Sequence, residues 1–504
     1  MILQMMQNIC MYFYVSVDIY VVLIFLLTYG LWNLKRPHSR FPPGPIGIPF
    51  FGSMFQLRKD PEKVVKKWSL NHYGPVMSVP LANQHYIYLN TYEAVQAAFL
   101  KQGSKFSGRP NMFLFHQVSQ NYGLALKTYG EDFKVQRKFG NKILRGLGFG
   151  QKKMEDIINR EGDHFIKHLE KYSGRPVNIK ADIYNLTSNI ICGVALGRRF
   201  EYDDPMFREI LFCTEKSMGD PHDAWKILML VICPKARFLP FIRGANERYK
   251  QNQLKILGLM KNIVKEHKET FNPNCLSDFI DAYLYEQQHG LGKGNNQFED
   301  RQLEVYVRDL FFAGTETSSN TICWGLLILL HYPEFKSKIE EEIAEAIGWT
   351  NTPSVSHREN MPFTCAFLQE LVRFRTLTPG GSPHCTTEPA ELFGYHIPKG
   401  TMVMANIWGV NNDPSEWPNP EVFDPYRHIN DNKQFVHSSK IIPFSMGPRV
   451  CLGEQLARME IFIIMVKVLQ HFKVEADAEL PSLQPGVNSV LCAPQSYKLV
   501  LSPH

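Results

Sequence analysis

Apolar residues near the C-terminal end of the chain recur at intervals of three and four. Between Glu454 and Phe472 the recurring positions are Leu456, Met459, Ile463, Val466 and Leu469. This spacing places them on one face of an α-helix, so we expect a buried helix there. The apolar-rich run from Asp300 to Tyr332 predicts a second, longer helix, which Pro333 ends.

Shorter patterns complete the framework. Residues 362–376 and the basic stretch that begins at residue 129 each predict a helix. Residues 152–281 are rich in helical patterns, with a proline-bounded break at 234–240. Two β-prone runs between Val76 and Leu89 flank Pro80-Leu81-Ala82-Asn83, which predicts a hairpin, and a helix should follow from about Thr91.

The N-terminal pattern differs, because residues 11–32 are mostly apolar and carry Asp18 as their only charge. As a helix this run would span about 33 Å, enough for the core of a bilayer. Basic residues follow the run and none precedes it, which puts the rest of the chain in the cytosol. A cleaved signal peptide is the alternative, but a basic n-region and a clear cleavage site are missing. We therefore expect a membrane anchor over residues 1–34.

A proline-rich stretch follows the anchor and reads Phe41-Pro42-Pro43-Gly44-Pro45-Ile46-Gly47. Proline cannot continue the membrane helix and makes a stiff connector, although an ordinary proline-rich loop has the same composition. We expect residues 35–50 to be a hinge. No Ser/Gly-rich or charged linker divides the rest, so residues 51–504 are expected to form one catalytic domain.

Composition narrows the class of protein. A hydrophobic content of 44% is ample for a large core, and a net charge of +6 over 504 residues does not suggest a nucleic-acid partner. The ten cysteines stand far apart without a Cys-x-x-Cys pair, which argues against a disulfide framework or a zinc cage. Reduced cytosolic thiols are the better expectation.

One cysteine, Cys451, has the neighbours of a ligand site, namely Phe444, Gly447, Arg449 and Gly453. It stands just ahead of the C-terminal helix, whose N–H groups and dipole favour an anion, so we expect an easily deprotonated thiol. The glycines permit close approach of a bulky ligand, and Arg449 can neutralise an acidic group on it. These features point to haem with a cysteine axial ligand, against the alternative of a small buried hydrophobe.

A polar island interrupts the apolar centre of the long helix, with the sequence Ala313-Gly314-Thr315-Glu316-Thr317-Ser318. Buried polar groups need partners, and a cluster that breaks local rules is expected at a functional site. The hydroxyl of Thr317 beside the carboxyl of Glu316 can organise water that delivers protons. The alternative is a kinked helix whose threonine side chains bond to their own backbone.

Four further features are less specific. Glu370 and Arg373 lie three apart on one predicted helix and can pair, which on a surface contributes little. The alternative interpretation of Arg137 is a solvated surface charge. The alternative interpretation of His384 is a histidine in a solvent-facing loop. The loop Gly290–Gly294 follows no strand and is better read as a linker than as a nucleotide loop. Since no dinucleotide motif appears elsewhere, reducing equivalents must come from another protein.

The five specified residues of the Phe-x-x-Gly-x-Arg-x-Cys-x-Gly stretch match the haem-binding loop of the cytochrome P450 superfamily of haem-thiolate monooxygenases. The resemblance extends over nearly the whole chain, because its features follow one another in the family's order. These features are the anchor, the hinge, the helix that carries Arg137, the helix that carries Glu316 and Thr317, the Glu-x-x-Arg pair and the cysteine loop. The hinge and the segments Phe423–Arg427 and Pro383-His384 look most like animal microsomal family-2-type members. The resemblance implies a mainly α fold with small β-sheets, preceded by an N-terminal transmembrane helix.

The resemblance also implies roles for individual residues. Haem b would take the Cys451 thiolate as its axial ligand, with the remaining haem contacts from Arg449, Arg137, His384, Phe444, Gly447 and Gly453. Phe133 stands where tryptophan is usual, which puts one propionate hydrogen bond in question. Glu316 and Thr317 occupy the proton-delivery positions. A structural brace would join Glu370, Arg373 and Arg427, with His428 where phenylalanine is usual.

The implied reaction inserts one oxygen atom of O2 into a lipophilic substrate such as a fatty acid, a steroid or a xenobiotic, while the other atom leaves as water. Electrons would come from NADPH through NADPH–cytochrome P450 reductase, with cytochrome b5 as a further candidate partner. A basic docking face would involve Lys134, Lys138 and Arg458. The expected location is the endoplasmic reticulum membrane, with the catalytic domain on the cytosolic side and no nucleic-acid partner.

Substrate-pocket segments assigned by the resemblance are residues 111–124, 207–241, 307–317, 377–382 and 489–492. Two alternatives come from other classes, namely a haem-thiolate isomerase or dehydratase and a haem-binding protein without catalysis. Both can dispense with the acid–threonine pair, which this chain retains.

Overall fold

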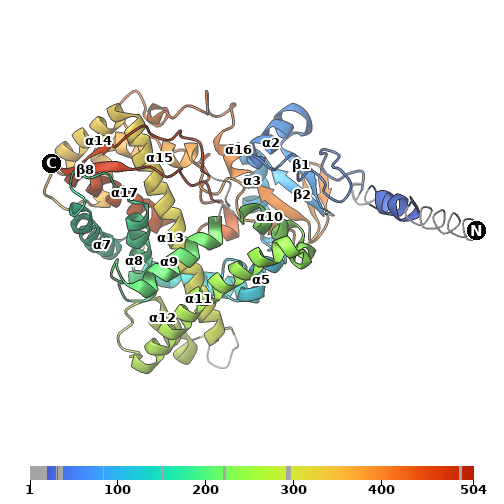
Figure 1. Ribbon diagram of the computed structural model, residues 1–504, viewed down its shortest axis with the longest axis horizontal. Coiled ribbons are helices and arrows are strands. Elements are labelled where there is room, and N and C mark those ends of the chain that lie inside the picture. Colours follow the sequence, from blue (N-terminus) through green and yellow to red (C-terminus); the bar gives the residue numbers. More distant parts are fainter. Residues whose placement is uncertain are drawn as a thin grey trace, which may run out of the picture. The chain divides into compact units, whose positions relative to one another are not determined.

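The computed structural model describes residues 20–29, 31, 38–82, 84–148, 151–219, 223–290, 297–486 and 491–504 (Figure 1). Backbone contacts divide the chain into two compact units. The first comprises Met1–Gly108 and Ser382–Asn406, and the second comprises Arg109–Gly381 and Ile407–His504. The single catalytic domain expected over residues 51–504 stays a prediction.

The first unit is built on a four-stranded mixed sheet with the strand order β1-β2-β6-β3. Strands β1 (Val76–Leu81) and β2 (Gln84–Leu89) form the expected antiparallel hairpin. Strand β6 (Met402–Ala405) adds parallel to β2, and β3 (His384–Cys385) pairs antiparallel with β6. The sheet therefore joins segments of the chain that lie about 300 residues apart in sequence.

The remaining elements of the first unit are short: α2 (Pro61–Trp68), η1 (Ser69–Tyr73), α3 (Tyr92–Val95), η2 (Gln96–Lys101), α4 (Gly103–Phe106), β4 (Ala390–Leu392) and β5 (Tyr395–Ile397). The proline-rich stretch lies along β1. Ser78 donates its backbone N–H to Pro43 O at 2.7 Å and its hydroxyl to Pro42 O at 2.8 Å. This part of the hinge is thereby fixed to the edge of the sheet.

Most of the anchor predicted over residues 1–34 lies outside the described residues. Residues 20–29 are helical, and their apolar side chains are exposed. Across the ranges that the structure describes, no helix has both the length and the apolar character needed to cross a membrane.

The second unit is dominated by helices (Figure 1). They are α5 (Phe113–Ser119), α6 (Glu131–Gly146), α7 (Lys152–Glu170), α8 (Lys180–Ala195), α9 (Pro205–Gly219), α10 (Ala224–Ile232), η3 (Pro234–Phe238), α11 (Pro240–Thr270), α12 (Phe279–His289), α13 (Asp300–His331), α14 (Pro333–Ala346), η4 (Val355–Asn360), α15 (Pro362–Phe374), α16 (Ile407–Asn411), η5 (Pro425–His428), η6 (Gly447–Arg449) and α17 (Glu454–His471). Its two strands, β7 (Phe472–Ala476) and β8 (Leu499–Pro503), form an antiparallel pair. This architecture confirms the mainly α fold with small sheets.

Helices α13 and α17 form the centre of the second unit. Helix α13 contacts α8, α11 and α17, and α17 contacts α7 and α14 as well. The apolar positions predicted for α17 are buried, and Ile463, Val466 and Leu469 have no exposed surface. Because α17 is buried over most of its length, its N-terminus holds the cysteine loop at a fixed place in the core.

Candidate functional site

The cysteine loop turns sharply immediately before α17. Ser445 and Gly447 have φ angles of 61° and 77°, in the left-handed region that glycine adopts without strain. The backbone N–H of Cys451 donates to Phe444 O at 3.0 Å and that of Val450 to Gly447 O at 3.0 Å. These bonds close the loop and present the Cys451 side chain on one side of it.

The Cys451 thiol is accessible to solvent, although it lies within the protein. Burial raises its pKa, and the Gly453 N–H with the charges of Arg137 and Arg458 only partly oppose this. The expectation of an easily deprotonated thiol is therefore wrong for the protein alone, since desolvation outweighs the helix terminus. A Cβ at Gly453 would meet no atom within 4 Å, so the backbone there is open to a flat ligand. An open thiol beside open backbone fits haem.

The two predicted propionate arginines are held by main-chain carbonyls near this loop. Arg449 donates to Leu124 O at 3.3 Å and Lys127 O at 2.6 Å, and its guanidinium lies 3.6 Å from the centre of the Phe133 ring. Phe133, which replaces the usual tryptophan, thus supports Arg449 through a cation–π contact. Arg137 donates to Val450 O at 2.6 Å.

The polar island forms the middle of α13, and the hydroxyl groups of its two threonines are bonded to the helix itself. Thr315 and Thr317 donate to the carbonyls four residues earlier at 2.8 and 2.7 Å. This pattern is the alternative anticipated for the threonines. Close packing explains why glycine stands at position 314, because a Cβ there would lie 3.0 Å from the Ile191 side chain of α8. Alanine would push the two helices apart.

Helix α8 also braces the island through two residues that the sequence did not single out. Thr187 donates to Thr315 O at 3.0 Å, and Ser188 donates to Thr315 Oγ1 at 3.1 Å. Both are buried. Neither stands in a recognisable motif, so the polar positions within an otherwise apolar helix were the one signal available.

Glu316 is buried beside this bonded hydroxyl array. Its Oε2 accepts from Asn320 at 3.1 Å, whereas Oε1 has no partner in the described structure. Burial raises the pKa of Glu316 to about 7, against the lowering effects of the Lys180 charge and the Asn320 bond. A carboxyl that titrates near neutral pH can both hold and release a proton there.

Glu370 and Arg373 are fully buried, so the pair is not the weak surface contact that its spacing alone suggests. Arg373 donates to both carboxylate oxygens at 2.8 and 2.6 Å. Arg427 adds an ion pair at 3.3 Å, and the N–H of Asp424 donates at 3.1 Å. Glu370, Arg373 and Arg427 therefore lie together in the structure.

His428 is an additional partner of this carboxylate. Its Nε2 lies 3.0 Å from Glu370 Oε2, and the residue is 2% exposed. Burial opposes ionisation, but the bonds from Arg373 and His428 lower the pKa of Glu370. The sequence marked His428 as a departure from the family, and the structure shows that the departure adds a polar contact to a buried charge.

His384 lies in β3 of the first unit and is buried, so the solvent-facing alternative is wrong. Its Nδ1 is 2.7 Å from Phe106 O, and its ring stacks on Phe99 at 3.9 Å.

Of the expected docking residues, Lys134 pairs with Glu131 at 3.3 Å and Arg458 with Glu454 at 2.9 Å. Ser489, in the last predicted pocket segment, lies outside the described residues.

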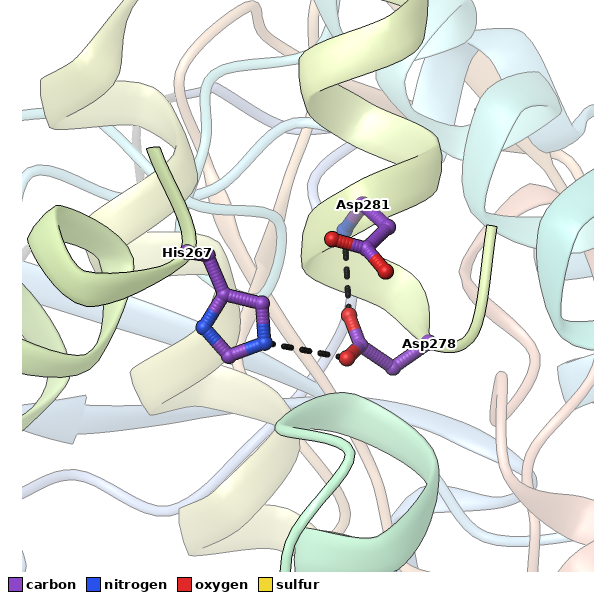
Figure 2. A group of neighbouring side chains, drawn as sticks. All are labelled: His267, Asp278 and Asp281. Carbon is purple, nitrogen blue, oxygen red and sulfur yellow. Dashed lines mark hydrogen bonds and ion pairs between the residues drawn. The ribbon is translucent and has the colours of Figure 1, made fainter. Parts of the chain in front are cut away.

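A separate group of metal-ligand types joins α11 to α12 (Figure 2). His267 Nε2 lies 3.0 Å from Asp278 Oδ2, and His267 Nδ1 lies 2.9 Å from Ile263 O. Asp278 caps α12 by accepting from the Asp281 N–H at 3.0 Å. With Nδ1–H donated to a carbonyl, the Nε2 contact requires an imidazolium, so the group is a charged clamp between two helices.

Comparison with known proteins places these features in a family. The Cytochrome P450 family model matches residues 42–501. The chain is 32% identical to Cytochrome P450 2C28 of Mesocricetus auratus, over 95% of this chain and 97% of that protein. It is 34% identical to Cytochrome P450 2J2 of Homo sapiens over 89% and 88%, and 31% identical to Cytochrome P450 2U1 of Bos taurus over 94% and 91%.

Replacing His428 by phenylalanine should destabilise the protein. The change removes one hydrogen bond to a buried carboxylate, which is expected to lower the free energy of unfolding by about 1.5 to 3 kcal/mol. Urea unfolding followed by circular dichroism would measure the difference. Arg373→Met is the matched comparison and should cost about 3 to 5 kcal/mol, because it leaves the Glu370 charge uncompensated. Equal stability of His428→Phe and the natural chain would show that this contact contributes nothing.

The His267 clamp should make stability depend on pH. Although burial opposes it, the hydrogen bond and charge of Asp278 raise the pKa of His267. A histidine whose pKa is raised by folding stabilises the protein fully below its unfolded pKa of about 6.5, and this stabilisation is lost as the pH rises through the folded value.

The measurement is the melting temperature as a function of pH for the natural chain and for His267→Gln. The difference between them should be largest near pH 6 and should shrink at alkaline pH. His164→Gln, at an exposed position of α7, is the control and should follow the natural chain at every pH. A difference that stays constant over the whole range would contradict the charged clamp.

Proposed function

Because the chain belongs to the cytochrome P450 family, it is a haem-thiolate monooxygenase, and we propose that Cys451 supplies the thiolate to its haem b. The geometry of the cysteine loop carries this assignment. The thiol is open on one side, receives the Gly453 N–H on the other, and stands at the end of a left-handed turn at Gly447. Haem, when bound there, supplies the chemistry that activates oxygen.

The two arginines are proposed to neutralise the acidic groups of the haem. Arg449 is held by two carbonyls and by the face of Phe133, which leaves its position fixed before any ligand binds. Arg137 uses one of its five N–H groups on Val450 O and has further donors to offer. Phe444, Gly447 and Gly453 are proposed to shape the loop around the haem, and His384 is proposed as a further haem contact.

Glu316 and Thr317 are proposed to deliver protons. Thr317 donates its own proton to Ala313 O, so the lone pairs of its oxygen can accept from water. Ala313 is exposed one turn earlier on the same face, in the mostly buried middle of the helix. Glu316, with a pKa of about 7 and an unbonded oxygen, can exchange protons with that water near neutral pH.

The proposed substrate is lipophilic, and the class includes fatty acids, steroids and xenobiotics. Electrons are proposed to come singly from NADPH through NADPH–cytochrome P450 reductase, with cytochrome b5 as a further partner. The docking face would include Lys138, which is exposed, together with Lys134 and Arg458. The proposed location is the endoplasmic reticulum membrane, supported by the exposed apolar side chains of residues 20–29.

The assignment of the thiolate predicts a spectrum. Reduced protein exposed to carbon monoxide should show the strongly red-shifted Soret band of thiolate ligation, and Cys451→Ser should lose it. Cys275 is also exposed, in the loop before α12, so Cys275→Ser is the control and should keep the band. A Cys451→Ser protein that kept the red-shifted band would assign the ligand elsewhere.

The proton-delivery role predicts a change in coupling. Thr317→Ala should consume NADPH while releasing more hydrogen peroxide for each product molecule, by about tenfold. The measurement is the ratio of peroxide to product with reductase present. Thr321→Ala removes a hydroxyl that likewise donates to the carbonyl four residues earlier, one turn further along α13, and should leave coupling unchanged. Equal coupling in Thr317→Ala and the natural chain would exclude the role.

A further inference from the structure

Arg308 is a buried cation of α13 whose hydrogen-bonding capacity is largely unused. It is 6% exposed, and its contact among the described residues is an ion pair from Nη2 to Asp309 Oδ1 at 2.8 Å. A guanidinium carries five N–H donors, so four of them have no acceptor in the part of the chain that the structure describes. Among the described residues, no Arg308 nitrogen is counted with the fully enclosed side-chain atoms that lack a partner, so its unbonded donors reach solvent-accessible space, where a ligand can accept from them.

The Asp309 carboxylate does not accept the remaining N–H groups of Arg308, because both of its oxygens already accept other hydrogen bonds. Oδ2 accepts the backbone N–H groups of Leu124 and Ala125 at 2.9 and 3.1 Å. The carboxylate thereby fixes the loop after α5 to α13. The negative charge of Asp309 is shared among three donors, while Arg308 keeps most of its own capacity.

Helix α11, which contacts α13, carries two more buried polar groups. Tyr249 and Gln253 lie one turn apart and are 8% and 4% exposed. In the described structure neither the Tyr249 hydroxyl nor the Gln253 amide makes a hydrogen bond, and the Gln253 amide nitrogen is fully enclosed. Burial raises the pKa of Tyr249, and the Arg308 charge opposes this, so the two groups lie within electrostatic reach.

Apolar side chains surround these three donors. Tyr249 packs in a cluster with Leu114, Leu230, Ala236 and Ile242. Leu257, one turn after Gln253 on α11, packs against Val305 of α13, three residues before Arg308. The donors therefore stand at the edge of an apolar region, which suits a molecule with an acceptor-rich end and a lipophilic body.

We propose that Arg308, assisted by Tyr249 and Gln253, binds the carboxylate of a lipophilic acid. The two oxygens of a carboxylate accept parallel N–H bonds from a guanidinium, which orients the acid as well as binding it. The inference rests on the proposed function and narrows its substrate class, because an acid bound by its carboxylate at Arg308 would present its hydrocarbon chain to the apolar side chains of α5, α11 and α13. Arg308 is thus a specificity-determining residue.

The test compares laurate with its uncharged partner lauryl alcohol by equilibrium dialysis against purified holoenzyme. The quantity measured is the Kd of the alcohol divided by the Kd of laurate, because this ratio cancels the contribution of the shared chain. In Arg308→Met the ratio should fall at least tenfold below that of the natural chain, since the charge-assisted bonds are lost. Arg308→Lys keeps the charge with fewer donors and should retain an intermediate ratio.

Lys261→Met is the matched control, because it removes a positive charge from an exposed position of α11. Its ratio should equal that of the natural chain, and an equal fall in this variant would overturn the proposal in favour of general surface electrostatics. An unchanged ratio in Arg308→Met, or no preference for laurate in the natural chain, would also overturn it.

Two checks keep the outcome interpretable. The reduced carbon monoxide spectrum reports whether each variant is folded and thiolate-ligated, and if Arg308→Met fails it, Gln253→Leu takes its place with an expected two- to fivefold fall in the ratio. Failure of the natural holoenzyme to oxygenate any lipophilic compound would count against the proposed function alone, because the binding ratio does not depend on turnover.

Discussion

The buried carboxylate of Glu370 is the charge on which the position of the chain leading into the cysteine loop depends. A carboxylate without exposed surface is tolerated only when donors and opposite charges compensate it. Here Arg373, His428 and the Asp424 N–H form hydrogen bonds to Glu370, and Arg427 adds an ion pair. Three of these four partners come from the segment between α16 and the cysteine loop, which has little regular structure. The cluster therefore gives an irregular segment a fixed position that its own backbone does not specify.

The same support continues along the chain toward the cysteine. Gln369, next to Glu370 on α15, accepts the N–H of Ser438 at 3.1 Å and donates to Val436 O at 3.1 Å. Asn411 of α16 accepts the N–H of Ile442 at 3.2 Å. Side chains of two helices thus bind the backbone that leads into the loop, and α17 fixes its other end. A ligand thiol held from both ends loses little further freedom when it binds a metal.

Helix α13 combines structural and chemical roles in the same few residues. Gly314 lets α8 approach closely. The hydroxyl groups of Thr315 and Thr317 are bonded within α13, and two hydroxyl groups of α8 donate to Thr315. These bonds satisfy the island, so it persists inside an apolar core. Glu316 is the exception, because one of its oxygens remains unbonded in the described structure. The packing therefore leaves this carboxyl, whose pKa is raised to about 7, incompletely satisfied, which suits the proton-exchange role proposed for it.

Much of this protein was determined by sequence alone. Periodicity placed α13, α15 and α17 to within about two residues, and the alternation around residues 80–83 gave the first hairpin. The ordered motifs identified the family, because five specified residues around Cys451 leave little room for coincidence. These features are local, and local spacing is what a sequence records directly.

Tertiary structure decided the energetics of the site. The sequence favoured an ionised Cys451, but burial within the fold raises its pKa. Spacing alone made Glu370 and Arg373 a weak pair, whereas full burial makes them a cluster that also takes in His428. Arg308 stood in no motif at all, and it became conspicuous only when its neighbours on α11 were known. Desolvation and the count of hydrogen-bond partners depend on residues far apart in the chain, so no stretch of sequence contains them.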